Sequence, residues 1–156
     1  MGKGEQTRQR IVARAAPVFN THGYSGTSMA ELTRATGLEK GGIYNHFASK
    51  EALAIAAFDY AVQVVAERFA TALAGKEGAI ERLRAIIDSF ADYIENPPVA
   101  GGCPILNTAV EVDDSDSALR ARAQAAMTDL QKLIGSNVKR GVETGELRPD
   151  AEPRRV

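Results

Sequence analysis

The amino-acid sequence predicts an all-α fold with a pair of short helices near the N-terminus. Apolar residues recur at three- and four-residue intervals along most of the chain, and no segment shows the strict alternation of a half-buried strand. Glycines and prolines interrupt these stripes where helices are expected to end. The composition, 44% hydrophobic and 25% charged over 156 residues, is ordinary for a globular chain of one large or two small domains.

The first helical segment contains a proline. Pro17 deletes one backbone hydrogen bond and clashes with the turn that contains Ala13, at a typical cost of about 3 kcal/mol. We therefore expect a kink at this point of the helix.

Residues 28–47 are predicted to form two short helices that meet at a tight turn. Ser28 and Glu31 have the spacing at which each side chain satisfies the other's free backbone N–H, so the first helix begins near Met29. Gly37 then supplies the backbone freedom that a sharp corner requires. This arrangement is a helix-turn-helix.

The second helix of the pair starts at about Glu39. Leu38, Ile43 and Phe47 have the spacing of its inner face. The residues left to project outward are short, polar or aromatic: Glu39, Lys40, Gly42, Tyr44, Asn45 and His46. Because each glycine costs about 1 kcal/mol relative to alanine inside a helix, their presence favours close approach to another molecule.

Such a helix fits the major groove of duplex DNA. Lys and Asn side chains reach base-edge acceptors and donors there, while Tyr and His donate hydrogen bonds to phosphate oxygens. The alternative interpretation is a short surface helix in a helical bundle.

Residues 8–53 resemble the N-terminal domain of the TetR/AcrR family of transcriptional regulators. The matching positions are Ile11, Ala15, Phe19, Gly23, Tyr24, Thr27, Ser28, Gly37, Tyr44, His46, Phe47, Lys50, Glu51 and Leu53. The resemblance implies three helices, of which the third enters the major groove, and a fourth that holds a phosphate through Lys50, just after the Ser49 cap. The expected DNA contacts are Thr27, Ser28, Glu39, Lys40, Gly41, Gly42, Tyr44, Asn45, His46 and Lys50.

The resemblance also implies a larger, all-helical C-terminal domain that binds a small ligand and dimerises. We assign residues 5–65 to the DNA-binding domain and residues 66–156 to this regulatory domain. Family members usually continue for some tens of residues past the turn at 145–150, so the regulatory domain is expected to be short at its C-terminus. We still expect a homodimer, because helix-turn-helix dimers engage half-sites about one DNA turn, ~34–36 Å, apart.

Two positions depart from the family pattern, Pro17 in the first helix and Thr33. Thr33 stands where the family usually has Ala against the partner helix. Either the helix pair is slightly wider here, or the hydroxyl bonds back to a backbone carbonyl.

Charge is distributed unevenly along the chain. The net charge is -1, but residues 1–53 hold seven Lys/Arg against four Asp/Glu, and residues 54–156 hold twelve against sixteen. The positive excess lies in the half with the DNA motif, where it would neutralise phosphates. A solvated helix face would produce the same modest excess.

The rest of the chain is predicted to form four more helices. A long one runs from about 49 to 73 and links the two domains, with Leu53, Ala57, Tyr60 and Val64 as its stripe. The next carries Ile80, Leu83, Ile87, Phe90 and Ile94, and stops at 96–98, where two prolines follow Asn96. A short helix is expected over 104–112 with Pro104 first, and a long one after the acidic run 113–117, with Leu119, Ala123, Met127, Leu130, Ile134 and Val138 inside.

Aromatic and soft side chains in these helices predict a ligand pocket. Its candidate residues are Phe90, Tyr93, Cys103, Asn107, Met127 and Leu130, although each serves equally well as core. Glu111 is expected to be solvated. Cys103 precedes Pro104 at a helix start, where the helix dipole would make a thiol more reactive; the alternative is a small buried apolar residue.

Several classes of protein are not favoured by the sequence. No stretch approaches the ~20 apolar residues of a membrane span, and the N-terminus lacks the apolar core of a signal peptide, so a cytoplasmic protein is expected. One cysteine and two histidines without acidic partners predict no metal site and no cofactor. No constellation of catalytic residues appears. The favoured function is a ligand-responsive repressor that binds operator DNA and is released by a small-molecule effector; the alternative is a small-molecule or redox-binding protein with lost or weak DNA binding.

Overall fold

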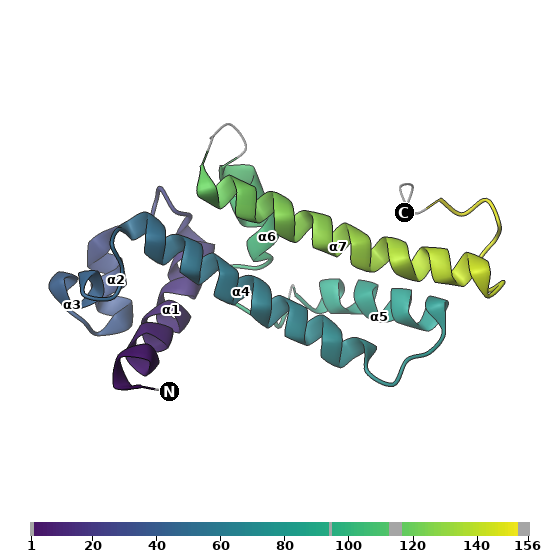
Figure 1. The fold of residues 1–156 in the computed structure, drawn as a ribbon, viewed down its shortest axis with the longest axis horizontal. Helices are drawn as coiled ribbons and strands as arrows, with labels where there is room; N and C mark the ends of the chain where they lie inside the picture. Colours follow the sequence, from purple (N-terminus) through teal and green to yellow (C-terminus); the bar gives the residue numbers. More distant parts are fainter. Residues whose placement is uncertain (1, 94, 113–116, 153–156) are drawn as a thin grey trace.

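The computed structural model describes residues 2–93, 95–112 and 117–152, and within these ranges the chain forms seven helices and no strand. A cluster of three helices stands at one end of an elongated bundle made by the other four (Figure 1). The helices are α1 Lys3–His22, α2 Met29–Thr36, α3 Lys40–Tyr44, α4 Lys50–Leu73, α5 Ala79–Asp92, α6 Pro104–Glu111 and α7 Ala118–Glu143. The all-α prediction is confirmed.

The turn chemistry of the helix-turn-helix forms as the sequence predicts. Ser28 accepts a hydrogen bond from the backbone N–H of Glu31, whose carboxylate accepts from the backbone N–H of Ser28 at 2.7 Å. These contacts lower the pKa of the Glu31 carboxyl, and His22 lies 3.0 Å from it. Gly37 ends α2 in the left-handed conformation, with φ of +70°. A residue with a side chain would be strained in this conformation, so glycine is favoured here.

Helix α1 passes through its proline without interruption. It is one helix of 20 residues, and Ile11, Val12, Ala15 and Ala16 are buried along it. Pro17 therefore costs the helix a hydrogen bond but does not end it. The expected kink stays a prediction.

One hydrophobic core joins the three N-terminal helices to the first half of α4. Its largest side chains are Ile11, Leu32, Ile43, Phe47 and Leu53, all almost fully buried. Val99, from the loop between α5 and α6, also belongs to this core. The loop therefore ties the regulatory half of the chain to the DNA-binding half.

Helix α4 runs through both halves of the molecule. Ser49 caps it by accepting from the backbone N–H of Ala52, and it continues without a break to Leu73, where the sequence places its end. The expected domain boundary at 65/66 lies inside this helix, so one continuous helix belongs to both halves. Tyr60, expected in the inner stripe, is exposed instead.

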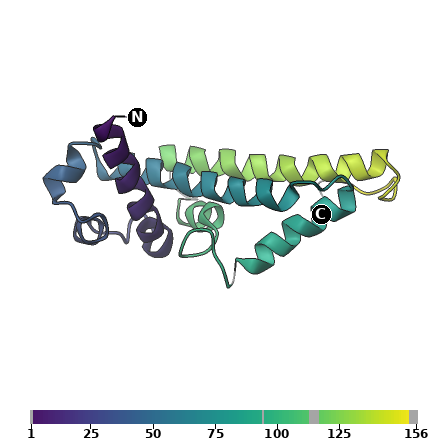
Figure 2. The same cartoon turned by 90° about the horizontal axis from the view of Figure 1, so that it is seen from below.

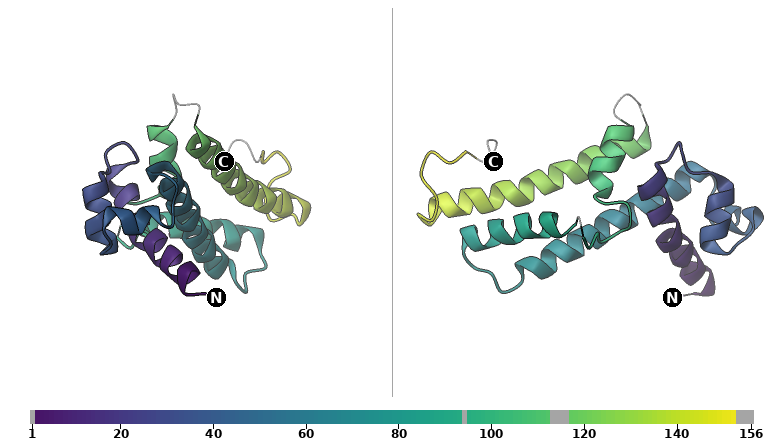
Figure 3. Two further views of the ribbon diagram at one scale, coloured as in Figure 1. Left: turned by 60° about the vertical axis from the view of Figure 1, so that its left-hand side comes forward. Right: turned by 180° about the vertical axis from the view of Figure 1, so that it is seen from behind.

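The regulatory half is a bundle of α4, α5 and α7 with the short α6 beside it. Helices α4 and α7 lie side by side and run in the same direction, and α5 runs back along them (Figures 1 and 2). Two further views show the same arrangement (Figure 3). Phe69, Phe90 and Tyr93 pack together at the centre, with ring centroids 5.2 to 6.3 Å apart.

Helix α5 buries a face that overlaps the predicted one only in part: Phe90 packs in the core as expected, but Ile80 and Ile87 of the predicted stripe do not. Ile80 and Ile87 are exposed, whereas Ala79 and Ile86 are buried; Ile94 lies outside the described residues. The rotation follows from contacts with α7. A side chain on Gly141 would lie 3.0 Å from the Ala79 methyl, so these two small residues let the helices approach closely.

A carboxylate fixes the start of α5. Glu146, in the turn after α7, accepts hydrogen bonds from the backbone N–H groups of Ala79 and Ile80, at 3.0 and 3.2 Å. These two contacts lower the pKa of Glu146. Arg82 adds a second tie by donating to Asn137 of α7 and to the Leu73 and Lys76 carbonyls.

The remaining predicted helices form within one residue of their expected bounds. Pro104 occupies the first turn of α6, and Ser117 caps α7 by accepting from the backbone N–H of Arg120. Residues 113–116 of the acidic run lie outside the described residues. No helix in the described ranges combines the length and apolar character needed to cross a lipid bilayer.

Candidate nucleic-acid interface

Helix α3 presents a polar outer face on a buried base. Ile43 and Phe47 are almost fully buried, and Leu38 packs on the same core. The exposed residues of the segment are Glu39, Lys40, Gly41, Tyr44 and Asn45, with His46 partly exposed. The predicted division is therefore confirmed except at Gly42, which was expected outside and is partly buried. Helix α3, of five residues, stands out at the end of the molecule (Figure 1).

The two glycines of α3 are not needed for packing inside the chain. A methyl group on Gly41 would meet nothing within 4 Å, and one on Gly42 would make ordinary contact with Leu38 at 3.5 Å. Gly41 is exposed and leaves the helix backbone open beside it, whereas Gly42 is partly buried beside Leu38.

Three cations border this surface, each over an aromatic ring. The Lys40 ammonium lies 5.9 Å from the centre of the Tyr44 ring, and the Lys50 ammonium lies 4.6 Å from that of Tyr24. The third, Arg8 of α1, lies 4.6 Å above Phe47 and was not among the expected DNA contacts. Nothing in the spacing of α1 distinguishes this arginine, because only the folded chain brings it over Phe47.

Two of the expected DNA contacts have structural tasks. The side chain of Thr27 is buried, and its hydroxyl donates to the Gly23 carbonyl at 2.6 Å. Its contact with DNA stays a prediction. The Ser28 hydroxyl is exposed but forms the cap of α2. Thr33 donates to the Ala30 carbonyl at 2.9 Å, which confirms the back-bonding alternative for this residue.

Comparison with known proteins decides the family. Residues 11–57 match the family model of bacterial regulatory proteins of the tetR family, and residues 79–156 match that of the tetracyclin repressor-like C-terminal domain. The chain belongs to the TetR family.

The relatives of this TetR-family chain match most of its length. The chain is 30% identical over 151 residues to the HTH-type transcriptional repressor DhaR of Mycobacterium sp. strain GP1, and the match covers 94% of this chain and 72% of DhaR. A TetR transcriptional regulator from Chloroflexus aurantiacus is 50% identical, with a TM-score of 0.94 over 99% of this chain and 78% of that one. A TetR-family regulator from Cytophaga hutchinsonii is 38% identical, with a TM-score of 0.89 over the same shares. The protein is a DNA-binding regulator of TetR type.

In the regulatory domain, the six expected pocket residues do not line one cavity. Phe90 and Tyr93 pack in the aromatic cluster, and Cys103 is partly buried between two hydrophobic clusters. Met127 faces a shallow surface pocket between α6 and α7. The Asn107 amide donates to Asn20 at the end of α1, and Asn107 lines a separate surface pocket there, so its contact with a ligand stays a prediction.

An apolar groove between α4 and α7 contains one of the six residues, Leu130. Its volume is about 330 Å³. The groove is lined by Val62, Val65, Ala66, Phe69, Ala70, Leu73, Ile105, Ala126, Asp129, Leu130 and Leu133. Asp129 is the one charged side chain among them, so the groove suits an apolar molecule.

The interior beside this groove holds a buried hydroxyl. Among the described residues, the Tyr93 hydroxyl is the buried side-chain polar atom without a hydrogen-bond partner. Burial, with Cys103 nearby, raises the pKa of Tyr93 to about 12. The hydroxyl is therefore neutral at physiological pH and available as a donor.

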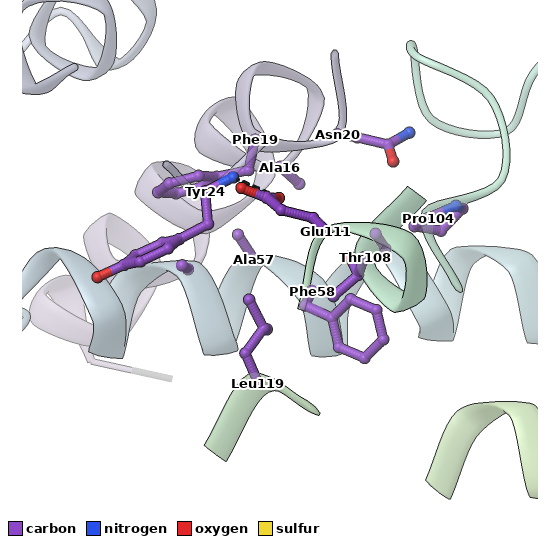
Figure 4. A pocket seen from close by; sticks show the side chains of 12 residues that line it. Ala16, Phe19, Asn20, Tyr24, Ala57, Phe58, Pro104, Thr108, Glu111 and Leu119 are labelled. Atoms are coloured by element: carbon purple, nitrogen blue, oxygen red, sulfur yellow. Dashed lines mark hydrogen bonds between the residues drawn. The ribbon is translucent and has the colours of Figure 1, made fainter. Parts of the chain in front are cut away.

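Glu111 is exposed, as expected, and its carboxylate also has partners within the chain. Its carboxylate oxygens accept hydrogen bonds from the backbone N–H groups of Tyr24 and Ser25, each at 2.8 Å (Figure 4). The sequence offers no sign of this contact, because 86 or more residues separate the partners.

Proposed function

We propose that this TetR-family protein is a cytoplasmic, homodimeric repressor that binds operator DNA through α3 and leaves it when a small molecule binds the regulatory domain. The observation that supports DNA binding most is the outer face of α3, where Lys40, Tyr44 and Asn45 project from a buried base. Repression is proposed because DhaR carries the name of a repressor.

The side chains divide by chemistry into two roles. Lys40 and Asn45 have the donors and acceptors that distinguish base edges in the major groove. Tyr44, His46 and Lys50 provide donors or charge for phosphate oxygens, which fix the orientation of the protein on the duplex. Gly41 and Gly42 leave room for close approach to the duplex.

The apolar groove between α4 and α7 is the proposed effector site. An effector that fits this groove better in one conformation of the bundle would shift the protein toward that conformation. Helix α4 lines the groove with its second half and carries Lys50 in its first turn, so movement in the groove reaches the DNA-binding end. The spacing of the two recognition helices in a dimer would then change.

Substitutions in α3 test the two roles. Lys40→Ala is expected to relax the preference for a selected duplex over a scrambled one, because each good base contact contributes about 1–3 kcal/mol of discrimination. Tyr44→Phe is expected to weaken binding to both duplexes about equally. Fluorescence anisotropy with both duplexes measures this, and Lys132→Ala, on exposed α7 surface far from α3, is the control. If Lys40→Ala weakened binding to both duplexes equally and Tyr44→Phe relaxed the preference, the roles of Lys40 and Tyr44 would be exchanged.

Filling the groove tests the effector site. The chain contains no Trp, so Leu130→Trp both occupies the groove and reports on it by fluorescence. We expect the wild type to bind the apolar dye anilinonaphthalene sulfonate and Leu130→Trp to bind it about tenfold more weakly, a loss of about 1.4 kcal/mol. Leu106→Trp, at an exposed position of α6, is the matched control. Equal dye affinity in Leu130→Trp and Leu106→Trp would rule out the groove as the binding site of apolar molecules.

A further inference from the structure

A set of hydrogen bonds joins α6 of the regulatory domain to the end of α1 in the DNA-binding domain. The Asn107 amide donates to the Asn20 carbonyl and side-chain oxygens at 3.2 and 3.0 Å, and to the Gly101 carbonyl at 2.8 Å. One turn further along α6, the Glu111 carboxylate accepts the two hydrogen bonds from Tyr24 and Ser25. Figure 4 shows Glu111 reaching from α6 toward Tyr24.

The loop after α1 is shaped around this carboxylate. Gly23 has φ of +75°, and a methyl group there would lie only 2.9 Å from a Glu111 carboxylate oxygen. The backbone conformation therefore favours glycine, and a side chain here would push the Glu111 carboxylate away from the loop. Two adjacent N–H groups that converge on one carboxylate make a charge-assisted contact, which is stronger than a contact between neutral groups.

The same loop supports a lysine of the proposed DNA surface. The Tyr24 ring lies 6.5 Å from the Phe19 ring on one side and carries the Lys50 ammonium 4.6 Å from its centre. Glu111 holds the backbone N–H of this tyrosine. A direct chain of contacts therefore runs from α6 through Tyr24 to Lys50.

We infer that Glu111 is a positioning residue for DNA binding, which holds Tyr24 so that its ring places the Lys50 ammonium for a phosphate oxygen. This inference rests on the proposed function, because Lys50 matters only if the protein binds DNA. It assigns a residue of the regulatory domain to the DNA-binding surface. Any displacement of α6 then alters the position of Lys50.

Nuclear magnetic resonance tests the contact chain without DNA. The Lys50 ammonium lies 4.6 Å from the centre of the Tyr24 ring, so the resonance of the adjoining ε-methylene protons is expected upfield of those of exposed lysines. Glu111→Ala is expected to return this resonance to the exposed position. Glu146→Ala is the matched control, because Glu146 also accepts from two successive backbone N–H groups, but within the regulatory domain. A Lys50 resonance unchanged in Glu111→Ala would overturn the inference.

DNA binding provides the second measurement, on a duplex enriched from a random-sequence library with the wild-type protein. Glu111→Ala is expected to weaken binding about two- to fivefold, the range of an exposed cation–π contact, whereas Glu146→Ala leaves it unchanged. Lys50→Ala is expected to lower the slope of log affinity against log salt concentration by about 1. In the Lys50→Ala background, Glu111→Ala should have no further effect, because it acts through the missing lysine.

The outcomes separate the two proposals. An equal loss from Glu111→Ala with and without Lys50 would show that Glu111 acts on DNA binding by another route and would overturn the inference. If the wild type enriches no duplex while the Lys50 resonance responds to Glu111→Ala, the proposed function fails and the positioning of Lys50 by Glu111 stands.

Discussion

Gly101→Ala is expected to destabilise the protein by about 2–5 kcal/mol. Gly101 has φ of +103°, and a methyl group there would lie 2.7 Å from the Asn20 carbonyl oxygen and 2.8 Å from its carbon. Backbone atoms cannot move aside as a flexible side chain can, so an overpacking cost of about 1–3 kcal/mol adds to about 1–2 kcal/mol of left-handed strain. The loop must separate from α1, and the contact between the two domains loosens.

The neighbouring glycine separates the clash from the strain. Gly102 also has a left-handed φ, of +91°, but a methyl group there meets nothing within 4 Å. Gly102→Ala is therefore expected to cost only the strain, about 1–2 kcal/mol. Urea denaturation of the wild type, Gly101→Ala and Gly102→Ala measures the difference in the free energy of unfolding. Equal midpoints for the two variants would show that the loop does not press on Asn20 as the structure describes.

Leu53→Ala is expected to destabilise the protein by about 2–5 kcal/mol, the usual range for a large aliphatic side chain removed from a core. Leu53 is 0% exposed and packs with Ile43 and Phe47, the two residues that hold α3 in place. DNA affinity at temperatures near the unfolding transition is expected to fall with stability, because the helix-turn-helix loses its support.

An exposed leucine provides the control for this substitution. Leu106 of α6 is 52% exposed, so Leu106→Ala is expected to change stability by no more than about 0.5 kcal/mol. Thermal and urea unfolding measure both variants. A loss below about 1 kcal/mol for Leu53→Ala would contradict the core that unites α3 with α4.

The helix-turn-helix was predictable because local interactions define it. The Ser28 cap, the left-handed Gly37 and the inward spacing of Ile43 and Phe47 all involve residues a few positions apart. Such signals act before any tertiary packing forms, so the sequence shows them directly. The starts of α4 and α6 were predictable for the same reason, from the Ser49 cap and Pro104.

The rotation of α5 was not predictable from its own residues. Its apolar residues allow two neighbouring faces, and larger side chains favoured the face with Ile80 and Ile87. The choice is made by partners distant in sequence, Gly141 and Glu146, which bring the small Ala79 against α7. The spacing of apolar residues within α5 cannot show which of the two faces these distant partners bury.

The six expected pocket residues do not line one cavity for a related reason. Residue types were correct for a pocket, but apolar side chains that line a cavity and those that fill a core share the same spacing. Asn107 and Glu111 are polar residues on a short helix, and only the approach of α1 shows that they bind the DNA-binding domain.

The most direct test of the account is fluorescence anisotropy of labelled DNA from the protein's own upstream region against a scrambled duplex, titrated across salt concentrations. Operator recognition through α3 predicts tighter binding of the upstream duplex at every salt concentration, with a preference that Lys40→Ala reduces. Equal affinity for the two duplexes at all salt concentrations, unchanged by Lys40→Ala, would contradict sequence-specific recognition of this upstream DNA by α3.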